Sequence, residues 1–196
     1  SQVSTGISGL LPFHGSHEFS EDVEVTTIAD IVAARSLQKV DFLKIDVEGM
    51  DFAVLRGVPW QSVKPDVIIC EFEDRKTRDL GHIWKDIADY LSEQGYAVMV
   101  SEWYPIQEYG RVHEWRSLRD YPCELADNDG WGNLIAFSIR PDDEALRSAL
   151  SATIKCQKRR NRVRNLLPVR LVGLAATTYR RIAFHVETQK NGRSIK

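Results

Sequence analysis

The sequence predicts an α/β fold in which a parallel sheet is covered by helices and followed by a helical tail. Apolar or β-branched runs alternate with helical patterns along residues 23–139, and residues 143–196 form a separate basic segment. Hydrophobic residues make up 43% of the chain and charged residues 28%, an ordinary globular balance. At 196 residues the chain holds one domain and an appendage. We therefore expect a domain over residues 1–140 and a tail over residues 141–196.

The N-terminal elements are short. Residues 1–20 are rich in Gly, Ser and His and are predicted to form a loop. Val23–Ile28 alternates polar and β-branched residues, which is typical of a half-exposed strand. Asp30–Leu37 then reads as a short helix with Ile31 and Ala34 on its apolar side.

Three strands and two helices are predicted next. Val40–Asp46 and Asp66–Phe72 have the apolar centres of parallel strands that are covered on both faces. A short helix over Met50–Arg56 lies between them, and a longer helix over Gly81–Gln94 follows. Tyr96–Trp103 is the third strand. This alternation indicates right-handed crossovers and a parallel sheet with helices outside.

A long polar connection over Tyr104–Gly132 precedes the predicted fourth strand, Leu134–Ile139. Loops of this length are often functional. Its aromatic residues could form a wall for a sugar or another flat ligand, or they could simply pack the loop onto the sheet; they are Trp103, Tyr104, Trp115, Tyr121 and Trp131.

The formal net charge of −2 hides an asymmetry. Residues 1–142 carry 13 Lys and Arg against 25 Asp and Glu, whereas residues 143–196 carry 13 against 3. Asp143–Asn165 is predicted to be a helix with a basic face, Pro168 ends it, and Leu171–Val186 could form another helix. Clustered Arg without interleaved aromatic residues is a weak nucleic-acid signal. A solvated helix face or a tether to a neighbouring domain is favoured over nucleic acid, anionic lipid or the acidic body as its partner.

The three cysteines, Cys70, Cys123 and Cys156, lie far apart and form no CxxC pair. They indicate a reducing compartment, and we expect a cytoplasmic protein. No signal peptide opens the sequence, and no apolar run approaches the roughly 20 residues that span a bilayer. Because the first residue is Ser1, we expect a processed chain or one that starts within a longer protein.

Acidic side chains gather where the first two buried strands end. Asp46 and Glu48 follow one strand and Glu71 ends the next, at the edge where open α/β sheets bind ligands. Lys44 lies at a depth where an apolar residue is normal, so it is expected to be buried and paired with Asp46 or Glu71. The alternative is that Asp46 or Glu48 caps the next helix and Lys44 reaches solvent from an edge strand.

Several motifs resemble the signature of the FkbM family of methyltransferases. That family has a strand ending in K-I-D-V-E-G, a helix ending in V-L-x-G and a further strand ending in Glu, preceded by a V-x-T-L-D segment and a serine-rich loop. The matching segments are Leu43–Gly49, Val54–Gly57, Pro65–Glu71, Val25–Asp30, Ser4–Ser8 and Pro12–His14. The resemblance covers about residues 1–140 and leaves the tail out.

The resemblance implies a Rossmann-like class I methyltransferase sheet, with Val40–Asp46 as its fourth strand, Asp66–Phe72 as its fifth and the later strands as a closing pair. It implies methyl transfer from S-adenosylmethionine to an oxygen, often a sugar or natural-product hydroxyl. Asp46 would lie beside the methyl group and contact the cofactor, and we expect it to be the base or to orient the reacting groups, with Glu48 as the next candidate. Glu48 and Glu71 would shape the same pocket, with Lys44 as the counter-ion.

The sequence departs from the family pattern at its N-terminal side. Strands one to three, the glycine-rich turn and the acidic residue that holds the ribose are absent, and Gly6, Gly9 and Gly15 are not spaced as G-x-G-x-x-G. We therefore expect an N-terminally incomplete sheet with an unpaired edge on its fourth strand. Such a fragment would be inactive without the missing N-terminal half of the domain.

Other residues and functions compete with this interpretation. His14, His17, Trp131 and Asn133 are candidates for contacts with a small-molecule or glycan acceptor, and either histidine could be the base. Asp46, Glu48 and Glu71 could also bind Mg²⁺ or Mn²⁺, but no further His or Asp cluster supports this, so no metal is expected. The competing function is a non-catalytic α/β interaction module that uses the basic tail.

Overall fold

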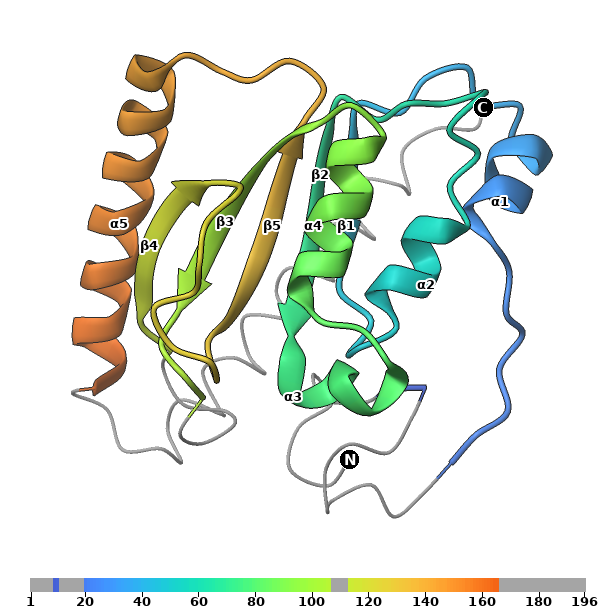
Figure 1. The fold of residues 1–196 in the computed structure, drawn as a ribbon. Helices are drawn as coiled ribbons and strands as arrows, with labels where there is room; N and C mark the ends of the chain where they lie inside the picture. The colour runs from blue at the N-terminus through green and yellow to red at the C-terminus, as the bar shows by residue number, and fades with distance from the viewer. Residues whose placement is uncertain (1–8, 11–19, 107–112, 166–196) are drawn as a thin grey trace, which may run out of the picture. The chain divides into compact units, whose positions relative to one another are not determined.

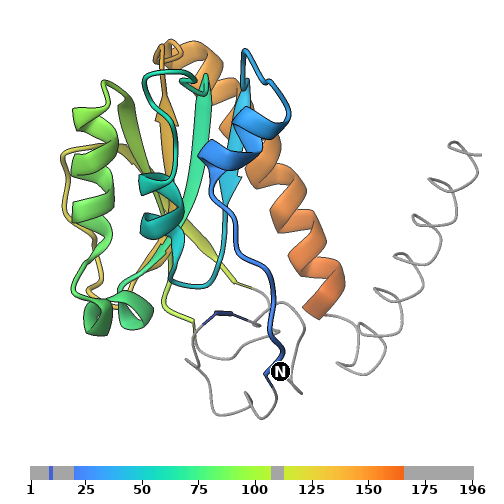
Figure 2. The same ribbon diagram turned by 90° about the vertical axis from the view of Figure 1, so that its right-hand side faces the viewer.

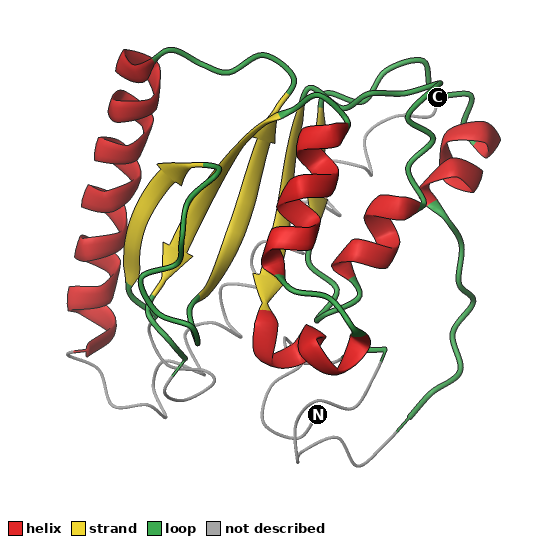
Figure 3. Ribbon diagram, viewed as in Figure 1, coloured by secondary structure: helices red, strands yellow, loops and turns green. Residues whose placement is uncertain are grey.

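The computed structural model describes residues 9–10, 20–106 and 113–165, and the chain falls into two compact units, residues 1–141 and 142–196. The described strands of the first unit form one five-stranded sheet in the order β1-β2-β5-β3-β4 (Figures 1 and 3). They are β1 (Phe42–Ile45), β2 (Val67–Glu73), β3 (Ala97–Trp103), β4 (Trp115–Asp120) and β5 (Trp131–Phe137).

The helices of the first unit connect these strands. They are α1 (Ile28–Ala34), α2 (Asp51–Arg56), α3 (Asp74–Thr77), the 3₁₀ turn η2 (Arg78–Leu80) and α4 (Trp84–Glu93). The second unit contains α5 (Asp143–Asn165), which begins after Asp142, whose side chain accepts a hydrogen bond from the Ala145 N–H. The predicted helices that correspond to α2, α4 and α5 are confirmed. None of the described helices is long and apolar enough to cross a bilayer.

One face of the sheet is covered by α2 and α4, which lie on the same side of it in Figure 2. Leu55 of α2 and Leu91 of α4 are fully buried against Ile68 of β2 and Val100 of β3. Alternate residues of a strand point to opposite faces. The odd-numbered positions of β2 therefore turn away from these helices, and they are only half-buried up to Glu71.

The three strands that were predicted to be parallel run in one direction, but the sheet as a whole is mixed. β1 pairs with β2 in parallel, but β5 lies between β2 and β3 and is antiparallel to both. β1, β2 and β3 thus run in one direction, as the predicted helical crossovers require, and β5 runs against them. β4 and β5 flank β3 on its two edges and are both antiparallel to it, so the connection between β4 and β5 passes across β3.

The strand predicted over Val23–Ile28 is also wrong: residues 23–27 form no regular secondary structure, and a helix begins at Ile28. The Thr27 side chain accepts a hydrogen bond from the Asp30 N–H, and the Asp30 carboxylate accepts one from the Thr27 N–H, a capping box that starts α1 at Ile28. Val32 is the buried residue of α1, whereas Ile31 is exposed, so the predicted apolar side was misplaced.

The connection predicted over Tyr104–Gly132 contains a strand that the sequence conceals. β4 pairs with β3 in antiparallel fashion, and its charged Arg119 contacts the fully buried Glu102. β4 lacks the apolar alternation that reveals most strands, and the half-buried Arg119 instead pairs with a buried glutamate. β5 begins at Trp131, before the predicted start. The predictions for residues 1–8, 11–19 and Leu171–Val186 lie outside the described residues.

Candidate functional site

The chain makes a left-handed turn directly after β1. Glu48 has φ 55° and Gly49 has φ 98°, a region that is costly for residues with a side chain. The buried Asp51 carboxylate stabilises the turn by accepting hydrogen bonds from the N–H of Gly49 (3.1 Å) and of Val47 (3.4 Å). Burial raises the pKa of Asp51. The turn directs Glu48 toward the end of β2.

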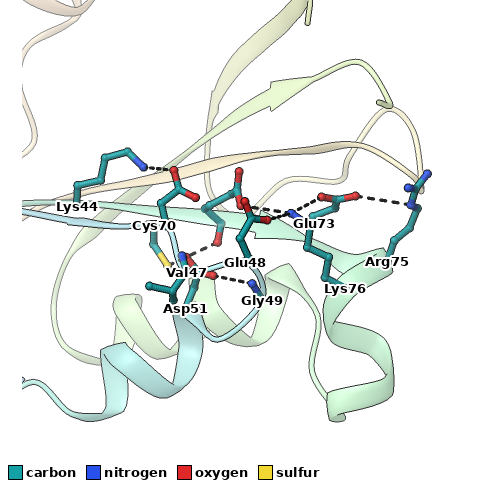
Figure 4. Close-up of polar contacts among 11 residues, drawn as sticks. Lys44, Val47, Glu48, Gly49, Asp51, Cys70, Glu73, Arg75 and Lys76 are labelled. Atoms are coloured by element: carbon teal, nitrogen blue, oxygen red, sulfur yellow. Dashed lines mark hydrogen bonds and ion pairs between the residues drawn. The ribbon is translucent and has the colours of Figure 1, made fainter. Parts of the chain in front are cut away.

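Three carboxylates surround one buried ammonium at this edge of the sheet, and we call them the Lys76 cluster. Lys76 Nζ lies 2.6 Å from Glu48 Oε2, 2.7 Å from Glu73 Oε2 and 3.7 Å from Glu71 Oε2. Figure 4 shows Lys76 reaching between Glu48 and Glu73. The side chains of Lys76 and Glu73 are 6% and 4% exposed. The cluster joins the turn after β1, the end of β2 and the start of α3.

The predicted burial of Lys44 is wrong. Its side chain is 46% exposed, because β1 is the end strand of the described sheet and one of its edges has no described neighbour. The predicted pairing with Asp46 is confirmed at 2.6 Å, but Asp46 is 45% exposed as well. The buried lysine that the carboxylates require is therefore Lys76.

The proton affinity of the Glu71 carboxyl is strongly raised. Burial raises the pKa of Glu71 to about 8; Lys76 opposes this, while the negative charges of Asp46 and Glu48 add to it. Burial alone would lower the pKa of the Lys76 ammonium, but its acidic neighbours outweigh burial and raise it. A carboxyl that binds and releases a proton near neutral pH is thus held beside a permanent positive charge.

The two described acceptor-binding candidates share this end of the sheet. Asn133 lies in register between Glu71 of β2 and Ser101 of β3, and Trp131 lies between Glu73 and Trp103. Asn133 lies within β5, whereas the strand was predicted to start one residue later, at Leu134. It follows that both residues occupy the sheet face that carries the Lys76 cluster.

The aromatic residues of the connection do not form one wall. The rings of Trp103 and Trp131 lie 5.5 Å apart, and the Trp115 indole donates a hydrogen bond to the Ser101 hydroxyl on the same face. Tyr121 instead packs against Trp84 of α4 on the opposite face. The sequence pattern predicted the aromatic content of this region but not its division between two faces.

Several residues of the site were not predicted, and two predicted residues lie outside the described ranges. Lys76, Glu73 and Asp51 were not predicted; the signal for Lys76 was its place three residues after Glu73, one helical turn beyond an acidic strand end. His14 and His17 lie outside the described residues. Within the described ranges, no three His, Cys, Asp or Glu side chains are grouped so that they could hold a metal ion.

Comparison with known proteins finds one matching family model. Residues 3–98 match the family model of the methyltransferase FkbM domain. This match is to the FkbM methyltransferase family that the motifs predicted, and it indicates a methyltransferase.

A second likeness is much weaker. The chain is 24% identical over 131 residues to the phenylalanine–tRNA ligase beta subunit of Archaeoglobus fulgidus, an alignment that covers 61% of this chain and 24% of that protein. The chain thus spans about a quarter of the length of that curated relative. No solved structure matches the chain.

Proposed function

We propose that this protein is part of an S-adenosylmethionine-dependent O-methyltransferase that acts on a hydroxyl of a sugar or natural-product acceptor. The observation that carries the proposal is the Glu71 carboxyl at the end of β2, whose pKa is raised to about 8. A base is most effective in removing a hydroxyl proton when its pKa lies near the working pH. The match to the FkbM domain supports methyl transfer as the reaction.

The charge of the site suits a cationic methyl donor. Carboxylates outnumber ammonium groups among its charged side chains, which are Asp46, Glu48, Glu71, Glu73, Lys44 and Lys76. Asp46 is half-exposed at the end of β1, and we expect it to contact the cofactor. When bound, the cofactor supplies an electrophilic methyl group.

We assign the remaining roles in the reaction to residues of this chain. Glu71 accepts the hydroxyl proton, and Asp46 orients the reacting groups. Asn133 and Trp131 hydrogen-bond and stack on the acceptor, since they flank Glu71 and Glu73 across the β2–β5 pair. His14 and His17 stay proposed acceptor contacts.

The topology supports a Rossmann-like class I sheet. β1, β2 and β3 run in one direction, and the reversed β5 completes the sheet between β2 and β3, in keeping with the closing pair that the family resemblance implies. No described strand pairs with the outer edge of β1. We propose that further strands of the same domain pair there and complete the cofactor site. The three cysteines are free, which supports a reducing, cytoplasmic location.

Methyl transfer from donor labelled in its methyl group tests the function. Glu71→Gln, which keeps the shape but cannot take up the proton, should lower kcat by about 100-fold or more. Asp46→Asn should lower turnover far more than cofactor affinity, measured by calorimetry. The exposed Glu124→Gln is the matched control and should leave both unchanged. Full activity of Glu71→Gln would remove Glu71 as the base.

A second measurement tests the proposed incompleteness of the cofactor site. The chain alone should give no calorimetric heat with S-adenosylmethionine, whereas a version extended at its N-terminus by further strands should bind it. Micromolar binding by the chain alone would contradict this.

A further inference from the structure

Lys76 has a geometry that the proposed function does not yet use. Its ammonium makes two contacts of hydrogen-bond length, to Glu48 at 2.6 Å and to Glu73 at 2.7 Å, whereas Glu71 lies 3.7 Å away, beyond that range. Charge-assisted hydrogen bonds hold a carboxylate in its ionised form. The Lys76 ammonium therefore contacts Glu48 and Glu73 directly and lies farther from Glu71.

The surroundings of Glu71 increase this inequality. Its side chain is 14% exposed, and the charged groups that act on it are Asp46, Glu48 and Asp51 around the turn after β1 and Lys76 on α3. Glu73, two residues further along β2, shares Lys76 with it. On β5 its register partner is the neutral Asn133. Glu71 is thus surrounded mostly by negative charge and receives only distant compensation.

We propose that Lys76 is a positioning residue: it binds Glu48 and Glu73 through short ion pairs and leaves Glu71 as the carboxyl of the cluster that exchanges a proton with the acceptor hydroxyl. This inference rests on the proposed function. As the hydroxyl oxygen bonds to the methyl carbon and the carbon–sulfur bond breaks, the hydroxyl proton passes to the Glu71 carboxylate. The positive charge on sulfur and the negative charge on Glu71 are both neutralised.

The direction of the Glu71 pKa shift agrees with the role proposed for Lys76. Burial raises the pKa of Glu71 to about 8 in spite of Lys76, so the nearby ammonium keeps Glu71 titratable near neutral pH. Without Lys76, the same burial and the same negative neighbours would keep Glu71 protonated to higher pH, where it could no longer accept a proton in the working range.

Titration of the Glu71 carboxyl tests the inference without requiring activity. In the full chain labelled with ¹³C at the glutamate carboxyls, Glu71 should titrate near pH 8. Lys76→Met should raise its pKa by about one unit or more, as expected when an opposite charge within 4–6 Å is lost. Lys76→Arg should keep it within about half a unit of the wild type, because the charge is kept. Lys85→Met, which removes a lysine paired with the exposed Glu124, should leave it unchanged.

Glu48→Gln keeps the inference testable if Lys76→Met does not fold. This variant removes a negative neighbour of Glu71 and an ion-pair partner of Lys76, so the pKa of Glu71 should fall. An unchanged Glu71 titration in both Lys76→Met and Glu48→Gln, or a wild-type value near 4.5, would overturn the assignment. These outcomes are independent of whether methyl transfer is found.

A pH profile then separates positioning from simple support of the fold. If the protein transfers methyl groups, the ascending limb of kcat should move to higher pH in Lys76→Met and stay in place in Lys76→Arg. A lowered rate with an unmoved limb would show that Lys76 only stabilises the structure.

Discussion

Gly49 packs directly against Lys76, because a β-carbon at position 49 would lie 3.3 Å from the β-carbon of Lys76. The same glycine has φ 98°, so its backbone and its neighbour both exclude a side chain. The left-handed turn after β1 and the buried lysine of α3 therefore depend on each other. This dependence gives the first prediction.

Gly49→Ala should destabilise the protein by more than Gly81→Ala. Gly81 has φ 80° but no atom within 4 Å of its would-be β-carbon, so its substitution isolates the backbone cost of about 1–2 kcal/mol for an alanine in this region. At Gly49 the displacement of Lys76 adds to that cost. Urea unfolding of the two variants measures both effects. Equal losses of unfolding free energy in the two variants would mean that Lys76 can move away from the new side chain at no energetic cost.

Lys76→Met should lower the free energy of unfolding by about 3–5 kcal/mol, the range found when one partner of a buried ion pair is removed. Glu48 and Glu73 lose their short contacts and stay largely buried. Lys85→Met is the control, since exposed pairs such as Lys85–Glu124 contribute about 1 kcal/mol or less. Chemical denaturation at pH 7 provides the comparison. Similar losses of unfolding free energy in the two variants would contradict the conclusion that the Lys76 cluster stabilises the fold.

Glu71→Gln should stabilise the protein at high pH while it impairs activity. With its pKa raised from 4.5 to about 8, Glu71 keeps a proton in the folded protein that the unfolded chain releases. Stability therefore falls as pH rises through this window, by at most about 1.4 kcal/mol per pH unit from this group.

Glu71→Gln lacks this fall in unfolding free energy, because glutamine does not titrate. The difference in unfolding free energy between variant and wild type should move in favour of the variant from pH 5 to pH 8 and then level off. Urea titrations at pH 5, 6.5, 8 and 9 measure it. A difference that is constant over this range would show that Glu71 has an ordinary pKa.

Thr27→Ala should destabilise the protein by about 1 kcal/mol, because it removes the N-cap of α1. The Asp30 N–H loses its acceptor, and Asp30 loses the hydroxyl that lowers its pKa. Thr26→Ala is the matched control, since Thr26 makes only one long contact of 3.5 Å to Asp30. Thermal unfolding distinguishes the two variants. A loss of the same size in both would show that the hydrogen bonds of the Thr27 cap do not stabilise α1.

The sequence predicted the elements whose signals are local. β1, β2, β3, α2, α4 and α5 were found because apolar runs, helical periodicity and glycine at helix ends require no knowledge of neighbours. Gly95 after α4, for example, has φ 79°, as expected for a residue that ends a helix.

The errors concern what lies beside an element. β4 was missed because Arg119 is compensated by Glu102, a partner 17 residues away that no local pattern reveals. The same holds for the site: Glu71 and Asp46 could be predicted from their places at strand ends. Whether Lys44 or Lys76 is the buried counter-ion depends on which strand stands at the edge of the sheet. Side-chain burial is a property of the assembled fold, and the sequence alone left it open.

The position of β5 has a consequence for how the chain is made. During translation β2 and β3 leave the ribosome before β5, and they cannot be joined until Trp131–Phe137 supplies the hydrogen bonds between them. Until then the nascent chain carries the parallel pair β1–β2 and the hairpin β3–β4 as two pieces with open edges. Such edges attract other chains, so a premature stop ahead of β5 should yield a product that aggregates rather than a smaller folded one.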